Sequence, residues 1–179
     1  MNQSKKIMRR RYRPSAYIAQ LRGLLNSLLH YMARVLPGGY IVRPFLHRLR
    51  GVKIGKNVWI GDDVYLDEDF PWTIEIQDGA TIAPRCTLIG HTKGPGRIVV
   101  ERESAIGTSC VIACGSGQTL TIGEGTVVSA GSTVLNDVPA FTLCGPPRIK
   151  VYGTVTVPWR KADTLEEFWR GVRPIRAKE

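Results

Sequence analysis

The chain has three histidines, and histidine is the side chain whose ordinary pKa best suits a general base near neutral pH. His30 and His47 lie in a basic N-terminal segment, where surface or packing roles are the usual ones. His91 instead follows Gly90 and opens a glycine- and proline-rich stretch, HTKGPG, at residues 91–96. A base there could take the proton from a hydroxyl or an amine during acyl transfer. From these residues alone, a solvent-exposed turn histidine explains His91 equally well.

Four cysteines, Cys86, Cys110, Cys114 and Cys144, suggest covalent catalysis as a second kind of chemistry. None has the C-x-x-C spacing of a metal site, and their flanks do not resemble a secreted disulfide framework, which favours a reducing compartment. Cys86 and Cys110 occupy a repeat position taken by small side chains, so we interpret them as core residues. Cys114 and Cys144 have no base beside them in the sequence. We therefore predict neither a covalent acyl-enzyme nor a metal site.

A six-residue period begins after Gly51 and must position these side chains. Aliphatic residues recur every six positions, and a small or β-branched residue usually follows four positions later. The aliphatic positions are Ile54, Ile60, Leu66, Ile76, Ile82, Leu88, Val100, Ile106, Ile112, Ile122, Val128 and Val134. A hexapeptide period is typical of a parallel β-helix, in which each side of a coil points one aliphatic side chain inward and stacked coils bury a common core.

The period breaks twice and is atypical at a third place, and we refer to these three places together as interruptions. Four extra residues stand near residues 69–72 and four more at residues 115–118, and the side at residues 91–96 is atypical although it stays in phase. Interruptions in a solenoid map to loops on one face, which is often the functional face. The sequence thus predicts loops around His91.

The 179 residues and their charge of +10 divide unevenly along the chain. Residues 1–50 hold eleven of the 25 Lys and Arg residues and none of the 15 acidic residues, so the rest of the chain has a net charge of −1. We predict a basic helical arm at 1–50, a β-helix catalytic domain at 51–138 and a tail at 139–179. A capping box from Thr164 to Glu167 predicts a short helix in the tail that ends at Gly171.

The arm carries an amphipathic pattern from about residue 15 to residue 36, followed by a shorter helical piece at residues 42–49. An apolar stripe recurs at helical spacing at Ile18, Leu21, Leu25, Leu28, Met32 and Val35. The stripe could pack against the body, or it could lie on an anionic membrane surface. We favour a combination, with one face docked and the basic tip at the membrane. A near-neutral body argues against nucleic acid as a partner, and the arm has no stretch long enough to span a bilayer.

Three stretches of the body resemble the hexapeptide-repeat acyltransferases. They are IAPRCTLIGH at residues 82–91, AIGTSCVIACG at residues 105–115 and TIGEGTVVSAGSTVLNDVPAFTLCGPPRIKV at residues 121–151. The nearest resemblance is to galactoside and maltose acetyltransferases and to sugar O-acetyltransferases of bacterial surface-polysaccharide pathways. It implies a left-handed parallel β-helix, a homotrimer, and transfer of acetyl from acetyl-CoA to a hydroxyl of a sugar or polysaccharide intermediate. It also implies a cytoplasmic enzyme, which the arm could hold at the inner face of the membrane.

The resemblance also implies roles for single residues. His91 matches the family's catalytic base, and Thr108 and Ala130 match positions that contact the pantetheine of coenzyme A. The family places a cation for the nucleotide phosphates where this chain has Ile149. Arg148 and Lys150, which flank Ile149, are the expected substitutes.

Two further side chains are expected to contact the acceptor. Arg85 replaces an asparagine that contacts the acceptor in galactoside-type relatives, and a cation there suits a phosphate or carboxylate on the acceptor. Asp67, Glu68 and Asp69 could orient His91 or hold sugar hydroxyls. A solvated loop is the preferred interpretation of these three acids, with Asp69 retained as the candidate for substrate binding.

Three other functions compete with O-acetylation. The first is N-acetylation of an amino sugar or a nucleotide-linked amino sugar. The second, a γ-type carbonic anhydrase, needs three histidine ligands, and the body offers only His91, so we set it aside. The third is a non-catalytic β-helix scaffold. Binding of acetyl-CoA separates the scaffold from the enzymes.

Overall fold

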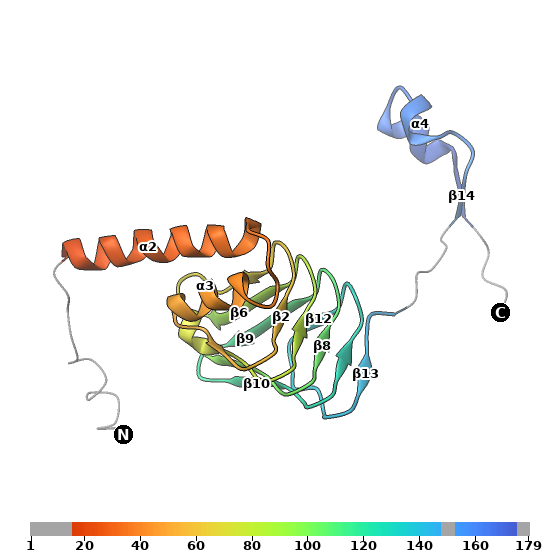
Figure 1. Cartoon of the computed structure of the whole chain (residues 1–179). Helices are drawn as coiled ribbons and strands as arrows, with labels where there is room; N and C mark the ends of the chain where they lie inside the picture. Colours follow the sequence, from red (N-terminus) through yellow and green to blue (C-terminus); the bar gives the residue numbers. More distant parts are fainter. Residues whose placement is uncertain (1–15, 148–152, 175–179) are drawn as a thin grey trace, which may run out of the picture. The chain divides into compact units, whose positions relative to one another are not determined.

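The computed structural model of the chain describes residues 16–147 and 153–174, with side chains from residue 21 onward. The chain divides into two compact units, Met1–Pro146 and Pro147–Glu179. The described part of the first unit contains two α-helices and a stack of β coils, and that of the second is a small hairpin with a short helix (Figure 1). In the described part of the chain, no helix is both long and apolar enough to cross a membrane.

The body of the first unit is a parallel β-helix whose coils each contribute one strand to three sheets. Sheet A contains β1 (Lys53–Ile54), β4 (Ile74–Ile76), β7 (Arg97–Val100) and β10 (Thr119–Ile122). Sheet B contains β2 (Trp59–Ile60), β5 (Thr81–Ile82), β8 (Ala105–Ile106), β11 (Val127–Val128) and β13 (Leu143–Cys144). Sheet C contains β3 (Tyr65–Leu66), β6 (Thr87–Thr92), β9 (Val111–Gly115) and β12 (Thr133–Val134).

The core follows the six-residue period. Ile54 pairs with Ile76, and Leu66 pairs with Leu88, so that each aliphatic position stacks on the equivalent position of the next coil. The twelve aliphatic repeat positions are buried except Ile54, which is partly buried and packs against the same core. Cys86 and Cys110 are fully buried beside them, and burial raises the pKa of the Cys86 thiol to about 11. Both cysteines are core residues, as their repeat position predicts.

The three interruptions of the period lie at one corner of the coil, between sheet C and sheet A. The first is residues 67–73, which include the 3-10 turn η1 (Pro71–Thr73), and the others are residues 93–96 and 116–118. These loops follow β3, β6 and β9, which are neighbours in sheet C. The expectation that they share one face is therefore confirmed, and β6, which ends at this corner, contains His91.

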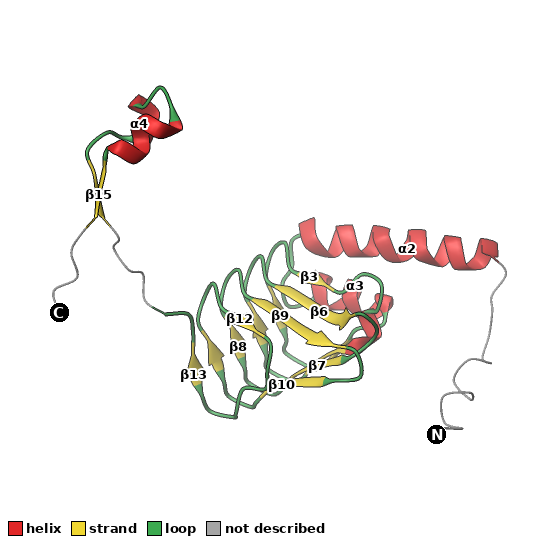
Figure 2. Ribbon diagram, turned by 180° about the vertical axis from the view of Figure 1, so that it is seen from behind, coloured by secondary structure: helices red, strands yellow, loops and turns green. Residues whose placement is uncertain are grey.

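The N-terminal arm covers the open end of the β-helix. Helix α2 (Ala16–Val35) packs on helix α3 (Val42–Arg50), and both lie at the first coil (Figure 2). The strands of a first coil have no preceding coil to bond to, and an open sheet edge invites unwanted pairing. Three arginines of α3 donate hydrogen bonds to the backbone carbonyls of this edge, one arginine on each sheet.

Each of these arginines donates to backbone carbonyls of the first coil. On sheet A, Arg48 Nε donates to the Ile54 oxygen at 3.0 Å and Nη2 donates to the Gly55 oxygen at 2.5 Å. On sheet B, Arg43 Nη1 donates to the Ile60 oxygen at 3.1 Å. On sheet C, Arg50 Nη2 donates to the oxygens of Leu66 at 3.0 Å and Asp67 at 2.9 Å. Part of the positive charge of the arm therefore has a structural role in capping.

Helix α2 docks with its polar face and leaves its apolar face uncovered. Asn26, Ser27 and Arg34 bond to the first coil, and Ala33 is buried beside them. The exposed apolar face consists of Leu21, Leu24, Leu25, Leu28, Tyr31 and Val35, each more than half exposed. The interpretation that the apolar stripe packs against the body is therefore wrong. Polar groups dock because the surface they meet is an edge of backbone carbonyls and acidic side chains.

The second unit is built on an antiparallel pair of strands. β14 (Gly153–Val155) pairs with β15 (Val172–Pro174), and between them lie η2 (Trp159–Lys161) and α4 (Leu165–Arg170). The Thr164 hydroxyl accepts a hydrogen bond from Glu167 N at 3.1 Å, and Gly171 follows the last residue of α4. The predicted short C-terminal helix and its Thr164 cap are confirmed, while the Glu167 side chain accepts from Asp163 N at 2.8 Å and not from Thr164 N as in a full capping box.

Two buried histidines at the interface between the arm and the first coil are expected to make the stability of the fold sensitive to acid. His30 and His47 are buried, and burial, aided by the charge of Arg50, lowers the pKa of His30 to about 4 and that of His47 to about 3. In the unfolded chain both histidines take up a proton near pH 6.5, whereas in the folded chain they stay neutral to a lower pH. The free energy of unfolding is therefore highest above pH 6.5 and declines as the pH falls. We expect unfolding in urea to show a loss of up to about 4 kcal/mol between pH 7 and pH 5.

A double variant, His30→Gln with His47→Gln, tests the assignment. Glutamine does not titrate, and its oxygen at position 47 can still accept the bond that Arg50 Nη1 makes to His47 Nδ1 at 3.0 Å. The double variant should have a flatter stability profile between pH 7 and pH 5 than the parent chain. A profile of equal slope in both proteins would contradict the prediction.

Candidate active site

His91 lies near the end of β6 with its side chain on the outer face of sheet C. Side chains alternate along this strand: Leu88 and Gly90 are buried, whereas Thr87, Ile89 and His91 face outward. The side chain of His91 is 28% exposed, which leaves room for a substrate to reach it. Gly90 must lack a side chain, because a Cβ there would collide with the hydroxyl of Thr73.

The carboxylate of Asp67 holds the imidazole of His91 from inside. Asp67 is fully buried, and its Oδ2 lies 2.5 Å from His91 Nδ1 and accepts a hydrogen bond from Gly90 N at 2.9 Å. Its Oδ1 accepts from Phe70 N at 3.0 Å. Because the carboxylate can only accept, the proton of the neutral imidazole resides on Nδ1, and Nε2 keeps its lone pair.

The first insertion of the repeat builds this arrangement. Residues 67–73 form a loop in which Thr73 Oγ1 donates to the Phe70 oxygen at 2.6 Å. The ring of Phe70 lies 4.9 Å from the ring of His91, centroid to centroid, and limits how the imidazole can turn. The sequence interpretation of Asp67 as part of a solvated loop is wrong, because this loop folds back under β6. The repeat contains a signal for this contact. Asp67 directly follows Leu66, and Leu66 pairs with Leu88, which precedes His91 by three residues.

Asp69 lies on the open side of the imidazole. Its carboxylate is 75% exposed, and its Oδ2 is 3.8 Å from His91 Nε2, the nitrogen that Asp67 leaves free. The structure thus brings together His91, Asp67 and Asp69. It leaves Glu68 on the arm side, where its carboxylate accepts a hydrogen bond from Ser27 Oγ at 2.5 Å.

The other predicted site residues lie at a different corner, between sheet B and sheet C. Arg85 is exposed there, in a left-handed conformation with φ of 59°, and helps to line a hollow of about 370 Å³ together with Tyr65, Thr87 and Ile89. Arg85 precedes β6 and His91 lies near its end. The six steps between them place their Cα atoms at most roughly 20 Å apart. One sugar ring does not bridge that distance.

Thr108 and Ala130 occupy the same B-to-C corner on consecutive coils. Gly131 N donates to the Thr108 oxygen at 2.9 Å, and a Cβ on Gly107 would collide with Ala130 N, so the two coils are in close contact here. Within one chain these residues are separated from His91 by the width of sheet C. Arg148 and Lys150 lie outside the described residues.

Thiol and metal chemistry receive no support from the described residues. Cys114 is buried, and burial raises its pKa above the ordinary value. Across residues 16–147 and 153–174, no group of three or more His, Cys, Asp or Glu side chains is arranged to hold a metal ion. The outward-facing His91 with a buried carboxylate behind it remains the arrangement suited to chemistry. In this parallel β-helix, the pair places an imidazole nitrogen at the edge of a coil, where it is chemically able to accept a proton.

Comparison with known proteins finds relatives that are named as acetyltransferases. The chain is 30% identical over 138 residues to the colanic acid biosynthesis acetyltransferase WcaF of Escherichia coli, an overlap of 63% of this chain and 75% of WcaF. It is 30% identical over 140 residues to the acetyltransferase YvoF of Bacillus subtilis, covering 72% and 77% of the two chains. No family model matches the sequence.

A solved structure agrees with these relatives. The hexapeptide-repeat acetyltransferase of Vibrio cholerae superposes with a TM-score of 0.54 and 25% identity, covering 74% of this chain and 89% of the other. The chain belongs to the hexapeptide-repeat acetyltransferase family. Its fold class, a left-handed parallel β-helix with an N-terminal helical arm and a short C-terminal helix, is confirmed.

Proposed function

We propose that the protein transfers the acetyl group of acetyl-CoA to a hydroxyl of a sugar or polysaccharide intermediate, with His91 as the general base. The observation that carries this proposal is the bond between His91 Nδ1 and the buried carboxylate of Asp67, which leaves Nε2 free beside the exposed Asp69. The name of WcaF, a colanic acid biosynthesis acetyltransferase, supports a glycan-related acceptor.

The proposed reaction is a direct transfer. His91 Nε2 takes the proton of the acceptor hydroxyl while the oxygen attacks the thioester carbonyl and forms a tetrahedral oxyanion. The Asp67 carboxylate stabilises the imidazolium that results. The oxyanion collapses, the carbon–sulfur bond breaks, and His91 returns the proton to the leaving thiolate. The products are the acetyl ester and free coenzyme A. In this proposal, Asp69 accepts a hydrogen bond from a second hydroxyl of the sugar.

A homotrimer is part of the proposal, because one chain does not bring all the predicted site residues together. Thr108 and Ala130, the predicted pantetheine contacts, lie across sheet C from His91. A neighbouring copy could present its Thr108–Ala130 corner to the His91 of the first. Arg148 and Lys150 are then proposed to hold the nucleotide phosphates of acetyl-CoA, which need cations.

The acceptor is proposed to carry a phosphate or a carboxylate. Arg85 is exposed beside the hollow that Thr87 and Ile89 of β6 help to line, about 20 Å from His91 if the strand is fully extended. An acceptor that reached both would need more than one ring, as in a nucleotide sugar, a lipid-linked sugar or an acidic glycan.

The experiment for this function is a screen of acceptors by mass spectrometry with acetyl-CoA as donor. The result expected is a gain of one acetyl group that mild alkali removes, because an ester is labile where an amide is stable. An alkali-stable product would point to N-acetylation. If calorimetry detected no binding of acetyl-CoA to the full chain, the scaffold interpretation would replace the enzyme.

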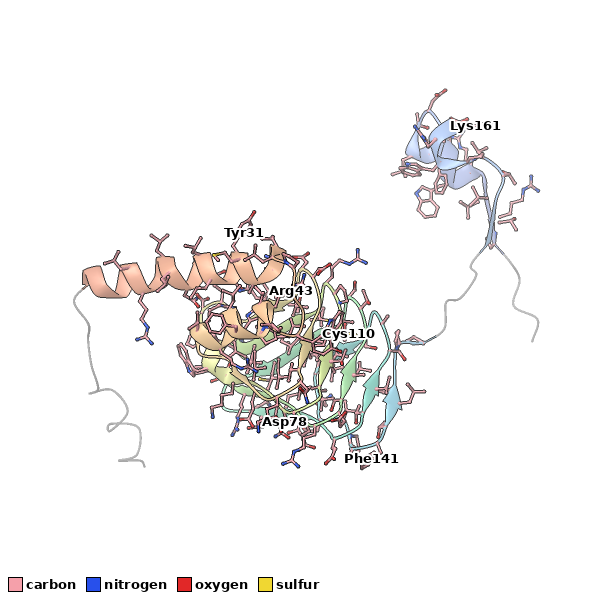
Figure 3. All side chains as sticks on the ribbon, in the orientation of Figure 1. Tyr31, Arg43, Asp78, Cys110, Phe141 and Lys161 are labelled. Carbon is pink, nitrogen blue, oxygen red and sulfur yellow. The ribbon has the colours of Figure 1, made fainter. Side chains whose placement is uncertain are left out.

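We further propose that the arm attaches the enzyme to an anionic membrane surface. The exposed apolar face of α2 points away from the first coil, as Tyr31 does in Figure 3, because the polar face of the helix is docked. In the sequence, Lys5, Lys6, Arg9, Arg10, Arg11, Arg13 and Arg22 precede or begin this face. An apolar helix face beside a basic segment is suited to the headgroup region of anionic lipids.

Vesicle binding tests the membrane proposal. Leu24→Glu with Leu28→Glu should weaken co-sedimentation with phosphatidylglycerol vesicles at least about tenfold, because two leucines proposed to enter the lipid are lost and two negative charges are added. Thr154→Glu, which adds a charge in the C-terminal unit, is the control and should bind like the parent. If the double variant bound vesicles normally but lost its oligomeric mass, the face would be covered by a second copy instead.

A further inference from the structure

The segment that carries Asp67 is held by the N-terminal arm. Three consecutive carbonyls, those of Leu66, Asp67 and Glu68, each accept a hydrogen bond from an arm side chain. Arg50 Nη2 donates to the first two at 3.0 and 2.9 Å, and Asn26 Nδ2 donates to the third at 2.7 Å. These residues lie 16 to 42 positions away along the sequence, so only the folded arm brings them here.

Arg50 is itself fixed on every nitrogen. Its Nε donates to Asn26 Oδ1 at 3.0 Å, and its Nη1 lies 3.0 Å from His47 Nδ1. The residue is 7% exposed, so the guanidinium is buried between α2, α3 and β3. A planar guanidinium with a partner on each of its three nitrogens has little freedom to move, and lysine cannot reproduce its forked geometry.

The backbone of Asp67 is consequently held from two sides. On the side of the next coil, Asp67 N donates to the Leu88 oxygen at 2.9 Å, which is a bond of the β-helix itself. On the arm side, Asp67 would have no partner coil, and Arg50 supplies the partner. The carboxylate that bonds to His91 therefore sits on a backbone whose position depends on α3.

We infer that Arg50, supported by Asn26, is a positioning residue for acetyl transfer: it fixes the backbone of Asp67 so that the carboxylate holds His91 in the orientation of a base. This inference rests on the proposed function. It gives the arm a role in the active site that is separate from any role at a membrane. A loss of positioning at a catalytic group costs about 10- to 100-fold in rate.

Arg48 provides a matched control. It is another arginine of α3 and also donates to two carbonyls of the first coil, at Ile54 and Gly55, but on sheet A, which does not carry Asp67. Arg50→Lys should lower kcat about 10- to 100-fold with little change in the KM for acetyl-CoA, whereas Arg48→Lys should leave kcat within about threefold of the parent. Equal kcat values for the two variants would overturn the inference.

Two readouts separate positioning from a general loss of stability. In an Asp67→Asn background, Arg50→Lys should cost less than about threefold in kcat, because the group through which it acts is already altered. Proton NMR gives a measure that does not need turnover. The far-downfield signal of an imidazole N–H held by a carboxylate should be present in the parent and in Arg48→Lys and should broaden or vanish in Arg50→Lys.

If Arg50→Lys fails to fold, Asn26→Ala takes its place. It removes the bond to the Glu68 oxygen and the partner of Arg50 Nε, and Ser27→Ala on the same helix is its control. A normal downfield signal and normal kcat in Asn26→Ala would count against the inference. A parent chain that showed the downfield signal but transferred no acetyl group to any acceptor would overturn the proposed function and leave the arm's hold on Asp67 standing.

Discussion

Replacing His91 with alanine is expected to lower kcat for acetyl transfer by about 10²- to 10⁴-fold, the contribution usual for a general base. Nε2 of His91 is the base atom in the proposed reaction, and alanine has no group that could take the hydroxyl proton of the acceptor in its place. The measurement is steady-state kinetics on the acceptor found by the mass-spectrometric screen.

The structure predicts that this variant loses little else. His91 is on the outer face of β6 and takes no part in the core, so the melting temperature and the affinity for acetyl-CoA by calorimetry should stay close to those of the parent. Thr92→Ala, on the exposed residue next to it, is the control for a change at the end of β6. A His91→Ala protein with more than a third of parental kcat would exclude His91 as the base.

The second large effect is expected for Asp67→Asn, which should lower kcat by about 10²- to 10⁴-fold while leaving the KM for acetyl-CoA nearly unchanged. Both carboxylate oxygens face donors: Oδ1 accepts from Phe70 N, and Oδ2 accepts from Gly90 N and His91. An asparagine has one oxygen, so its NH₂ group must face a donor on one side. When it faces His91, the imidazole changes tautomer and Nε2 loses its lone pair to a proton.

The same substitution should also weaken the fold, because a buried donor is left without a partner at a cost of about 1–3 kcal/mol. Asp69→Asn is the matched control. Its side chain is 75% exposed and does not bond to Nδ1 of His91, so its effect should fall on the KM for the acceptor and not on the orientation of the base. If Asp67→Asn retained parental kcat, the assignment of Asp67 as the orienting group would have to be abandoned.

The structure explains one part of the positive charge of the N-terminal segment, and the membrane proposal concerns another part. Arg34, Arg43, Arg48 and Arg50 bond to the first coil, where they pair with acidic side chains or cap backbone carbonyls. The basic residues from Lys5 to Arg13 lie outside the described residues, and the proposed contact with anionic lipid draws on them and on Arg22. A charge count alone does not separate these two groups, because both are arginine-rich and neither contains an acidic residue.

The six-residue period was sufficient to predict the β-helix, its core positions and the corner where its loops gather. One aliphatic side chain must point inward on each side of each coil. The residues that specify the fold therefore recur at a fixed, short spacing along the sequence. His91 could be picked out for the same reason, since it stands where that spacing is interrupted and its motif resembles a known family. The short C-terminal helix likewise follows from a local capping box.

Three features depend on tertiary structure. Asp67 stands in a run of three acids, D-E-D, that has the composition of a solvated loop, yet it is fully buried because the loop passes beneath β6. The apolar stripe of α2 has the pattern of a docking face, yet it faces outward because the edge it meets presents carbonyls and carboxylates. Arg50 and Asp67 are 17 residues apart and belong to different elements. Burial and partners across such separations depend on how coils and helices stack, and no local pattern of residues encodes that stacking.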